Sequence, residues 1–516
     1  MLARFSIFML LLLWVTACMA RAERLRISFR SDPATSMVVG WDQMMGDNPV
    51  LYYDTQSHQG DVVSYANQQG VDSQNDYAGM QNKFVRLQDL SPNTIYYFVI
   101  ADSEGVSQEY SFETLPDDSK ERISIIAGGD SRNYREARQA ANLMVGKLHP
   151  HVVMFGGDMT GGDTAKQWIR WMNDWQLTTS PSGRMTPIIA TRGNHEYSNT
   201  SIVALFDVPT ESNYYSLPIG GNLAQLYTLN SLIPAGGDQA EWLEDELIRS
   251  HENVYWQLAQ YHFATRPHTS RKAENNDQWH YWSKLFFNYG VDLVVESDAH
   301  VVKTTYPIRP SKKRGSQQGF IRDDKRGTVY IGEGCWGAPL RDNNDDKKWT
   351  RASGSFNQFK WIFIDREGIE VRTVKTDNSE EVGNECITDR FCVPSNINIW
   401  NPSTGDVLYI EQNKDVRYIG ESDSNLKVEV LDFNATSKDD KKEIKWITKN
   451  ENDTVNFELQ KAKSLGKRYT TIATVNGQGS SQEKNYYCFI DKDDSAESAY
   501  RLKKISSQGV TLFYLR

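Results

Sequence analysis

Short apolar runs alternate with helical patterns through residues 121–375, the middle of the chain. The apolar runs are rich in β-branched residues, and the stretches Arg135 to Leu148 and Thr164 to Trp175 repeat apolar positions at spacings of three and four residues, which predicts helices. Strands that alternate with helices favour a layered α/β domain. The second stretch carries an apolar stripe made of Trp168, Trp171 and Trp175. Such a stripe indicates packing into a core.

The two ends of the chain show a period of two instead. Residues 23–117 alternate apolar and polar positions between Asp, Gly and Pro turns, which predicts a small β-sandwich. Its expected strands include Arg24 to Phe29, Ser36 to Trp41, Lys83 to Leu87 and Ile95 to Ile100. Residues 376–425 are polar and predict a surface linker. Residues 426–516 return to short alternating strands and predict a second β-sandwich of the fibronectin or immunoglobulin kind. We therefore expect a multidomain protein.

The first residues resemble an export signal, because Arg4 precedes an apolar stretch, Phe5 to Ala17, that is too short to span a bilayer. Two cleavage patterns stay open. Ala20-Arg21-Ala22 suits an ordinary signal peptidase and gives a signal peptide over residues 1–22. Val15 to Cys18 resembles a bacterial lipobox and gives a lipoprotein signal to residue 17, with Cys18 as the lipid anchor. Either pattern predicts an extracytoplasmic protein that is secreted, periplasmic or anchored to the outer membrane.

Composition narrows the function classes. A chain of 516 residues predicts two to four domains, and its net charge of −10 disfavours nucleic acid as a partner. We expect a small phosphorylated substrate and contact with a membrane only through Cys18. In an oxidising compartment Cys386 and Cys392 could close a small disulfide loop. For Cys335 and Cys488 a buried free thiol is nearly as good an interpretation.

Acidic, amide and imidazole side chains follow the apolar runs of the middle domain. In chain order these residues are Asp130, Asp158, Asn194 with His195, His262, and Asp298 with His300. A sheet that delivers such groups from successive strands to one edge is typical of a two-metal hydrolytic site. Asp158 follows Gly156-Gly157, a turn that lets its carboxylate project from the strand end, so we expect it to bridge the two ions.

The motifs resemble those of calcineurin-like metallophosphoesterases, in the same order along the chain. They are Gly129-Asp130, Gly157-Asp158, Gly193-Asn194-His195-Glu196, Tyr261-His262 and Asp298-Ala299-His300. Within this family the chain is most similar to the purple acid phosphatases. Its segments Leu90 to Tyr97 and Ser111 to Thr114 resemble the fibronectin type III-like module that precedes the catalytic domain of those enzymes. The resemblance covers residues 23 to about 375. The last domain resembles a sandwich module of secreted Bacteroidetes proteins.

The resemblance implies a ligand set. Asp130, Asp158 and His300 would hold the first ion, and Asp158, Asn194 and His262 the second. Asp298 stands where the family usually has another histidine. His195 resembles the family's histidine that stabilises the phosphate or protonates the leaving oxygen.

Three departures from the family pattern alter these expectations. Gly161 replaces the tyrosine expected three residues after Asp158, which argues against a purple colour and a tightly held ferric ion. Arg132 cannot bind a cation but could clamp a phosphate oxygen, and pairing with a neighbouring acid is an equally good interpretation. Asp298 offers oxygen instead of nitrogen and moves the preference from zinc toward manganese, magnesium or calcium. The two divalent or trivalent ions could thus be Fe, Mn, Zn, Mg or Ca.

His268 lies six residues after His262 and could face the leaving group, although a solvated loop histidine is at least as good an interpretation. The leading hypothesis is an exported binuclear phosphatase that hydrolyses phosphate monoesters by attack of a metal-bound hydroxide. A phosphodiesterase or nucleotidase on the same metal core is the alternative enzyme. A surface adhesion protein with a degenerate site is the alternative from another class, motivated by the departures at Gly161, Arg132 and Asp298.

Overall fold

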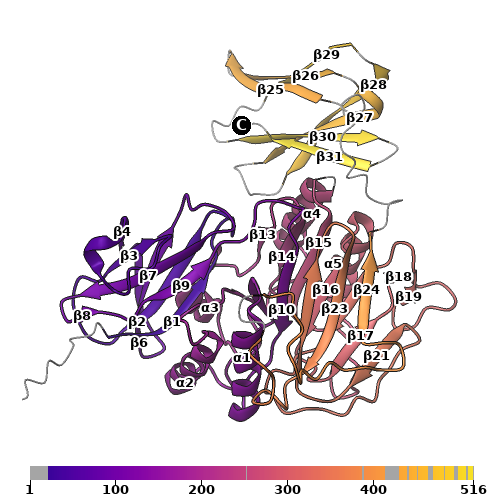
Figure 1. Cartoon of the computed structure of the whole chain (residues 1–516). Coiled ribbons are helices and arrows are strands. Elements are labelled where there is room, and N and C mark those ends of the chain that lie inside the picture. Colours follow the sequence, from indigo (N-terminus) through magenta and orange to yellow (C-terminus); the bar gives the residue numbers. More distant parts are fainter. Residues whose placement is uncertain are drawn as a thin grey trace, which may run out of the picture.

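The computed structural model describes residues 21–251, 253–385, 389–412, 429–438, 441–449, 451–462, 469–481, 483–492, 498–506 and 509–514. They form three units, an N-terminal β-domain, a central α/β domain and a C-terminal pair of small antiparallel sheets (Figure 1). The fold class expected from the sequence is confirmed. Among the described residues, no helix has the length and apolar character needed to cross a membrane.

The N-terminal domain consists of two facing sheets. One contains β1 (Ala22–Ser28), β2 (Met37–Gln43), β6 (Met80–Leu87) and β5 (Ser73–Tyr77), and the other contains β3 (Val50–Asp54), β4 (Asn67–Gly70), β7 (Ile95–Asp102), β8 (Gly105–Val106) and β9 (Tyr110–Glu113). Alternating apolar residues such as Val39, Val85 and Phe98 are fully buried in their shared core. This period of two follows from the alternation of side chains across a strand.

The first sheet continues into the central domain. Its order is β24-β23-β22-β10-β11-β12-β1-β2-β6-β5, ten strands in all. The additional strands are β10 (Ile123–Gly128), β11 (Val152–Phe155), β12 (Ile188–Ala190), β22 (Gln358–Ile364), β23 (Gly368–Lys375) and β24 (Val407–Glu411). Strands β10, β11 and β12 run parallel, and β1 joins β12 in parallel with Ser28 opposite Ile188. Strand β24 lies within the segment that the sequence predicted as a linker, and it pairs with β23.

A second sheet of seven strands completes the central domain. Its order is β13 (Tyr215–Ile219), β14 (Ala224–Thr228), β15 (Trp256–Phe263), β16 (Leu293–Ser297), β20 (Val329–Gly332), β17 (Val302–Thr305) and β21 (Thr350–Gly354). Along β15, Trp256 and Leu258 join the core shared with the first sheet, whereas Tyr261 packs against Trp282 of α5 (Asn276–Tyr289). Apolar residues thus fill both faces of the strand, as expected for a covered parallel sheet. A hairpin of β18 (Ile308–Pro310) and β19 (Phe320–Arg322) lies beside it.

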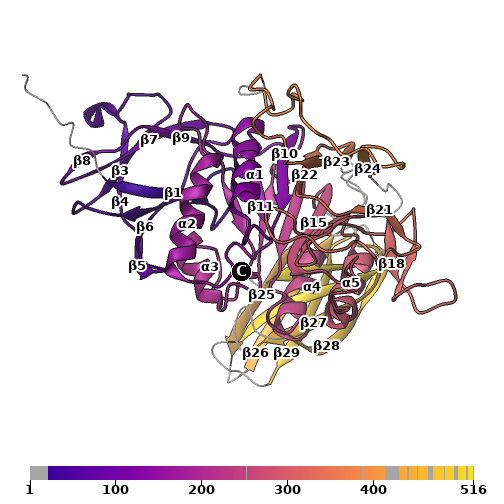
Figure 2. The same ribbon diagram turned by 90° about the horizontal axis from the view of Figure 1, so that it is seen from below.

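Helices cover the outer faces of the two sheets (Figures 1 and 2). Helices α1 (Arg135–Leu148) and α2 (Ala165–Trp175) pack on the first sheet, where Phe155 of β11 meets the rings of Trp171 and Trp175 edge-on. The three tryptophans of α2 are buried, so their predicted role as core residues is confirmed. Helix α4 (Asp238–His251) and α5 cover the second sheet through their apolar stripes. The short α3 (Asn199–Phe206) contacts β1 and β5 of the N-terminal domain.

The C-terminal unit packs a sheet of three strands on a sheet of four. The first contains β25 (Glu429–Lys438), β26 (Lys441–Lys449) and β29 (Asn485–Asp491); the second contains β28 (Thr470–Ser481), β27 (Glu451–Ala462), β30 (Ala499–Ser506) and β31 (Gly509–Tyr514). Trp446, Phe457 and Leu502 form its separate core. An ion pair between Arg501 and Asp245 joins this unit to α4.

Several predictions for the chain ends and cysteines lie partly outside the described residues. Residues 1–20 of the predicted signal peptide, with Cys18, fall outside them, as does Cys386. Cys392 is disulfide-bonded. Cys335 is a buried free thiol, whereas Cys488 is free but exposed.

Candidate metal centre

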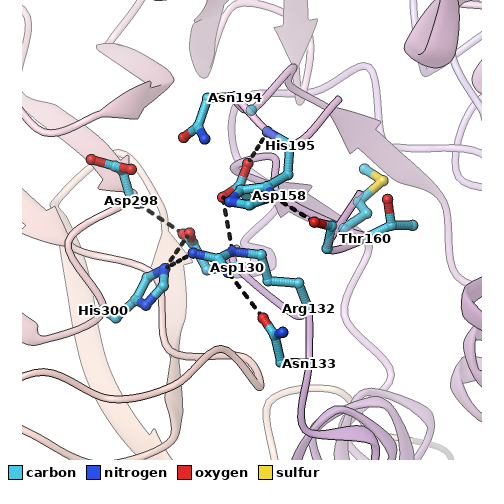
Figure 3. A network of polar contacts seen from close by, with 12 residues as sticks. Asp130, Arg132, Asn133, Asp158, Thr160, Asn194, His195, Asp298 and His300 are labelled. Carbon is cyan, nitrogen blue, oxygen red and sulfur yellow. Dashed lines mark hydrogen bonds and ion pairs between the residues drawn. The ribbon is translucent and has the colours of Figure 1, made fainter. Parts of the chain in front are cut away.

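Loops at the carboxyl ends of β10, β11, β12 and β16, together with the end of β15, meet at one edge of the two sheets. Figure 3 shows the side chains of Asp130, Asp158, Asn194, Asp298 and His300 gathered there. These loops carry the sequence-predicted ligands, which are Asp130, Asp158, Asn194, His262, Asp298 and His300. Parallel strands direct their carboxyl ends to the same edge. The pairing of β15 with β16 shifts register between Gln260 and Phe263. This irregularity accompanies the burial of His262 between the sheets, and such bulges are frequent beside functional sites.

The backbone of the site is held in conformations that few residues adopt. Asp130, Asp158, Asp298 and His300 all have left-handed backbones, with φ between 54° and 70°. This region is uncommon for residues other than glycine, and its use at several neighbouring positions is typical of functional sites. Gly156 is required by close packing, because a Cβ there would lie 2.1 Å from Ser297 Oγ. The strands can approach closely only with glycine at this position.

Asp130, Asp158 and His300 form the first group of ligands. One candidate ligand atom from each of these buried side chains lies within 4.8 Å of the others. His300 Nε2 lies 3.1 Å from Asp130 Oδ1, while its Nδ1 lies 2.8 Å from the carbonyl oxygen of Pro339. A carbonyl can only accept, so Nδ1 carries the proton and Nε2 presents its lone pair to the site. The peptide N–H of Asp298 donates to Asp130 Oδ2 at 2.8 Å and orients that carboxylate.

His262, Asn194 and Asp298 form the second group, beside Asp158. His262 Nε2 lies 3.1 Å from Asn194 Oδ1, 3.3 Å from Asp158 Oδ1 and 3.7 Å from Asp298 Oδ1. His262 Nδ1 lies 2.7 Å from the carbonyl oxygen of Gly156, so its Nε2 also faces inward. The Asp158 carboxylate is close to both groups: it clusters with Asp130 and His300, and its Oδ1 lies 3.3 Å from His262 Nε2. That position fits the predicted bridging role.

The carboxylates dominate the electrostatics of this centre. Burial acts to lower the pKa of His262, but Asp158, Asp130 and Asp298 outweigh it and raise the pKa to about 9. Burial acts to raise the pKa of Asp130, but His262 and His300 hold it down to about 2. Negative charge concentrated away from water favours any cation within reach.

His195 lies at the rim of the centre. Its peptide N–H donates to Asp158 Oδ1 at 2.8 Å, and its ring Nδ1 lies 2.8 Å from the carbonyl oxygen of Gly161. The ring Nε2 is 3.8 Å from Asp158 Oδ2, and the side chain is 25% exposed. The imidazole is therefore anchored at one nitrogen, with the other beside the ligands and open to solvent. The glycine that departs from the family pattern supplies this anchor through its backbone.

Glu196 belongs to the Gly193-Asn194-His195-Glu196 motif, but the sequence predicted no separate role for it. In the structure it supports the loops that carry the ligands. Its carboxylate accepts the peptide N–H groups of Asp158, Met159 and Gly193 at 2.8 to 2.9 Å. Burial, followed by the charge of Asp158, raises the pKa of Glu196 to about 7. These hydrogen bonds fix the turns that carry Asp158 and Asn194, so we assign Glu196 a positioning role.

Arg132 reaches into the first group. Its Nε donates to Asp158 Oδ2 at 3.2 Å, its Nη2 lies 3.3 Å from His300 Nε2, and its Nη1 donates to Asn133 Oδ1 at 2.9 Å. The position of Arg132 is therefore compatible with both interpretations from the sequence, pairing with a neighbouring acid and binding a phosphate oxygen. Arg132 pairs with a neighbouring acid, and that acid belongs to the metal centre, so the guanidinium lies where a phosphate bound to this centre would come.

Two further cations at the centre were not predicted from the sequence. Lys272 Nζ donates to Asp298 Oδ1 at 2.5 Å, and Arg341 Nη1 donates to the Asp298 carbonyl oxygen at 2.7 Å. Burial lowers the pKa of Arg341, which Asp298, Asp130 and Asp158 act to raise. Both residues belong to polar loops without a recognisable motif. Only the charge of Lys272, ten residues after His262, offered a signal.

His268 is not brought together with these residues. It is fully buried, its Nε2 lies 2.7 Å from Thr350 Oγ1, and its peptide N–H donates to Glu333 at 3.1 Å. Glu333 also pairs with the buried Lys303, which contacts Glu296 at 2.5 Å. His268 is thus part of an internal polar network, and its burial leaves no path to a leaving group. The solvated-loop interpretation fails for the same reason.

The donor set fits a pair of metal ions. Carboxylate oxygen, amide oxygen and imidazole nitrogen are all present, both histidines present Nε2, and both are oriented through Nδ1 by backbone carbonyls. Asp130, Asp158 and His300 would hold one ion, and Asp158, Asn194, His262 and Asp298 would hold the other. Mixed oxygen and nitrogen donors suit manganese, iron or zinc, and the added carboxylate of Asp298 favours harder ions.

Comparison with known proteins agrees with this reading. Residues 22–114 match the family model "Purple acid Phosphatase, N-terminal domain", and residues 123–302 match "Calcineurin-like phosphoesterase". The chain is 22% identical over 365 residues to an uncharacterized protein of Mycobacterium tuberculosis, covering 60% of this chain and 68% of that protein. It is 26% identical over 310 residues to purple acid phosphatase 13 of Arabidopsis thaliana, covering 49% and 54%.

Solved structures share the fold. A purple acid phosphatase from yellow lupin (Lupinus luteus) seeds superposes with a TM-score of 0.60 at 14% identity, covering 80% of this chain and 78% of that one. The structure of PhoD gives a TM-score of 0.52 at 11% identity, covering 69% and 87%. Calcineurin-like phosphoesterases bind a binuclear metal centre and are in general hydrolases. Two regions of the chain therefore match the purple acid phosphatase N-terminal domain and the calcineurin-like phosphoesterase domain, and the second region gathers candidate metal ligands at one edge of the two central sheets.

Proposed function

We propose that this protein is a phosphatase that hydrolyses phosphate monoesters at a two-metal centre. The observation that carries the proposal is the convergence of Asp130, Asp158 and His300 within 4.8 Å, next to His262 and Asn194. Two bound ions would supply a nucleophile from water near neutral pH and neutralise charge on the phosphate oxygens. The remaining tasks, which are binding and orienting the ester and moving a proton, fall to this chain's own side chains.

His195 is the proposed proton donor and phosphate ligand. Its Nδ1 is occupied by the Gly161 carbonyl, so a proton can be exchanged only at Nε2, which lies beside Asp158 and is open to solvent. The leaving alcohol oxygen needs a proton when its bond to phosphorus breaks. Imidazole is a suitable donor because its ordinary pKa lies near neutrality. The Gly161 carbonyl keeps the hydrogen of a neutral ring on Nδ1, so His195 can donate from Nε2, to a phosphate oxygen or to the leaving alcohol, only when its imidazole is protonated.

Arg132 and Arg341 are the proposed anion-binding groups. Both guanidinium groups reach the centre, through Asp158 Oδ2 and the Asp298 carbonyl respectively. A monoester carries up to two negative charges near neutral pH, whereas a diester carries one. Two guanidinium groups in addition to two metal ions therefore favour the monoester.

The substrate class is tested with a monoester and a diester of one chromophore. The purified protein is chelated, reloaded with a single cation at a time, and assayed for kcat/KM with each ester. We expect hydrolysis of the monoester to exceed that of the diester, and Asp158→Ala to abolish both. A clear preference for the diester would replace the proposal by a phosphodiesterase on the same ligands. Full binding of two ions without turnover of either ester would favour a non-catalytic role.

We also propose that the protein acts outside the cytoplasm. The apolar N-terminal stretch and the disulfide at Cys392 support this location, because disulfides persist mainly in oxidising compartments. The intact mass of the exported protein distinguishes cleavage after Ala22 from lipidation at Cys18. A mass that retains residues 1–22 in the mature protein contradicts both processing routes.

A further inference from the structure

Lys272 occupies an unusual position for a lysine in a cation-binding site. Its Nζ lies 2.5 Å from Asp298 Oδ1, and the same carboxylate oxygen lies 3.7 Å from His262 Nε2. The Asp298 side chain is 4% exposed, and that of Lys272 is 25% exposed. One oxygen atom thus faces both an ammonium group and the second group of ligands.

The loop between β15 and α5 brings Lys272 to this position. His262 lies at the end of β15, and the loop returns to the centre ten residues later. Asn275 closes the loop, because its side-chain amide donates to the Ala264 carbonyl at 2.6 Å and its peptide N–H donates to the Thr265 carbonyl at 3.2 Å. The peptide N–H of Lys272 donates to the Thr269 carbonyl at 3.3 Å. The ammonium is therefore delivered by a folded loop and not by a free side chain alone.

An ammonium on this oxygen opposes the binding of an ion there. The charge of Asp298 is shared with Lys272, so less of it remains for an ion held by His262 and Asn194. Two cations that contact one carboxylate oxygen also repel each other strongly in a buried site. In the first group, the Asp130 oxygens face His300 and the Asp298 peptide N–H, and the guanidinium of Arg132 reaches Asp158 and His300 instead.

We infer that Lys272 controls the second metal site by competing with the ion for Asp298 Oδ1, an inference that rests on the two-metal function proposed above. Aspartate in place of the family's usual neutral histidine adds one negative charge to the second group, and Lys272 compensates it. The second ion is consequently held more weakly than the first. When this ion binds, the ammonium leaves Asp298 Oδ1 and remains at the rim, where it adds positive charge next to the phosphate position.

Calorimetric titration with Mn²⁺ tests the inference on four chelated proteins: wild type, Lys272→Met, Asp298→Asn and the double variant. Methionine keeps most of the volume of the lysine stem and removes its charge. We expect Lys272→Met to lower the dissociation constant of the second ion about tenfold or more and to leave that of the first ion unchanged. Because Lys272 acts through Asp298, the same substitution should change little in the Asp298→Asn background.

Lys325→Met is the matched control, since it removes an exposed lysine from the same domain. It should leave both dissociation constants at their wild-type values. An unchanged first constant in Lys272→Met also reports that the variant is folded. A wild type that binds one ion and a Lys272→Met variant that binds two would support the inference in its strongest form.

Other outcomes overturn it. If the second ion binds Lys272→Met with an unchanged or a higher dissociation constant, the lysine does not compete with that ion. If Lys272→Met has the same effect in the Asp298→Asn background, the lysine does not act through Asp298. A single ion in every variant would overturn the inference together with the two-metal function. Monoester hydrolysis by two-metal wild type with no effect of Lys272→Met on ion affinity would overturn the inference alone.

Discussion

The two halves of the metal centre use the same bridging carboxylate but are stabilised differently. In the first half, Asp130 is oriented by the Asp298 peptide N–H and by His300. In the second half, Asp298 is held by the ammonium of Lys272, which we propose an incoming cation displaces. Arg132 also lies against Asp158 and His300 of the first half, so the difference between the halves is the ammonium placed directly on the added carboxylate of Asp298. Ligand identity alone does not set the affinity of a site, because the partners of each ligand decide how much of its charge is available.

The largest expected effect comes from removing what the two halves share. Asp158→Ala should lower kcat/KM for the monoester about 1,000-fold or more, because it weakens both ion sites at once. Metal content after gel filtration and steady-state kinetics measure the two effects. Retention of two tightly bound ions by this variant would contradict the bridging role.

Removing one ligand from each half should separate them. His300→Ala should abolish tight binding of the first ion, whereas Asp298→Ala should leave that ion in place and make activity dependent on added metal. We expect a loss in kcat/KM of about 1,000-fold for the first variant and about 10- to 100-fold at saturating metal for the second. Activity measured against free metal concentration distinguishes the two curves. Identical curves would mean that the halves are not independent.

His195 belongs to neither half as a ligand, so its removal should affect the reaction and not the ions. His195→Gln should lower kcat about 100-fold with both metal affinities retained, because proton donation to the leaving alcohol is lost. Esters with a more acidic leaving alcohol need less of this proton and should lose less. An equal loss for acidic and for poor leaving groups would assign His195 to phosphate binding only.

Arg132 tests how the first half meets the substrate. Arg132→Met should raise KM and lower kcat/KM about tenfold, because a charge-assisted hydrogen bond to the phosphate is lost. Inhibition by inorganic phosphate should weaken by a similar factor. Normal phosphate inhibition in this variant would leave Arg132 as a partner of Asp158 only.

The smallest effect on activity should come from His149, which lies away from the metal centre and contributes to the loss of stability at low pH. Burial, with Arg184 and Arg390 nearby, lowers the pKa of His149 to about 4. The unfolded chain takes up a proton near the ordinary value of about 6.5, so stability falls as pH drops from about 6.5 toward 4. The slope reaches about 1.4 kcal/mol per pH unit for this residue.

Chemical unfolding of His149→Asn at several pH values checks this slope. Asparagine tolerates the left-handed backbone of residue 149, and His149 Nε2 has no hydrogen-bond partner to lose. The variant should therefore lose less stability than wild type between pH 6.5 and 4. Equal pH dependence of the two proteins would exclude His149 as a cause. Acid loss of activity could then be assigned to the metal centre.

The candidate ligands of both halves could be predicted from the sequence, whereas Lys272 beside Asp298 could not. Asp130, Asp158 and His300 follow strands that their own apolar patterns reveal, and parallel strands must end at one edge. Helix α1 begins and ends at the predicted residues. Lys272 escaped prediction because its place depends on how a polar loop folds back, which no local pattern encodes. His268 was misplaced for the same reason: its partner Thr350 lies 82 residues further along the chain.

Contacts between distant segments account for the remaining differences. The polar composition of residues 376–425 indicated a linker, yet the short strand β24 gains its stability from pairing with β23, which composition does not report. Likewise, alternating residues in β1 predicted a strand of an N-terminal sandwich. Its parallel pairing with β12 depends on contacts between distant parts of the chain, which the alternation does not report.

The pairing of β1 with β12 has a practical consequence for truncated versions of the protein. Strand β1 pairs with β12, whose following loop carries Asn194, and Arg26 donates to the Leu205 carbonyl while Ser28 donates to the Phe206 carbonyl. A truncation that begins near residue 118 would remove the strand that pairs with β12 and expose an unpaired sheet edge beside the loop that carries Asn194. The N-terminal domain thus supports the central domain, and a shortened chain without it should aggregate on expression.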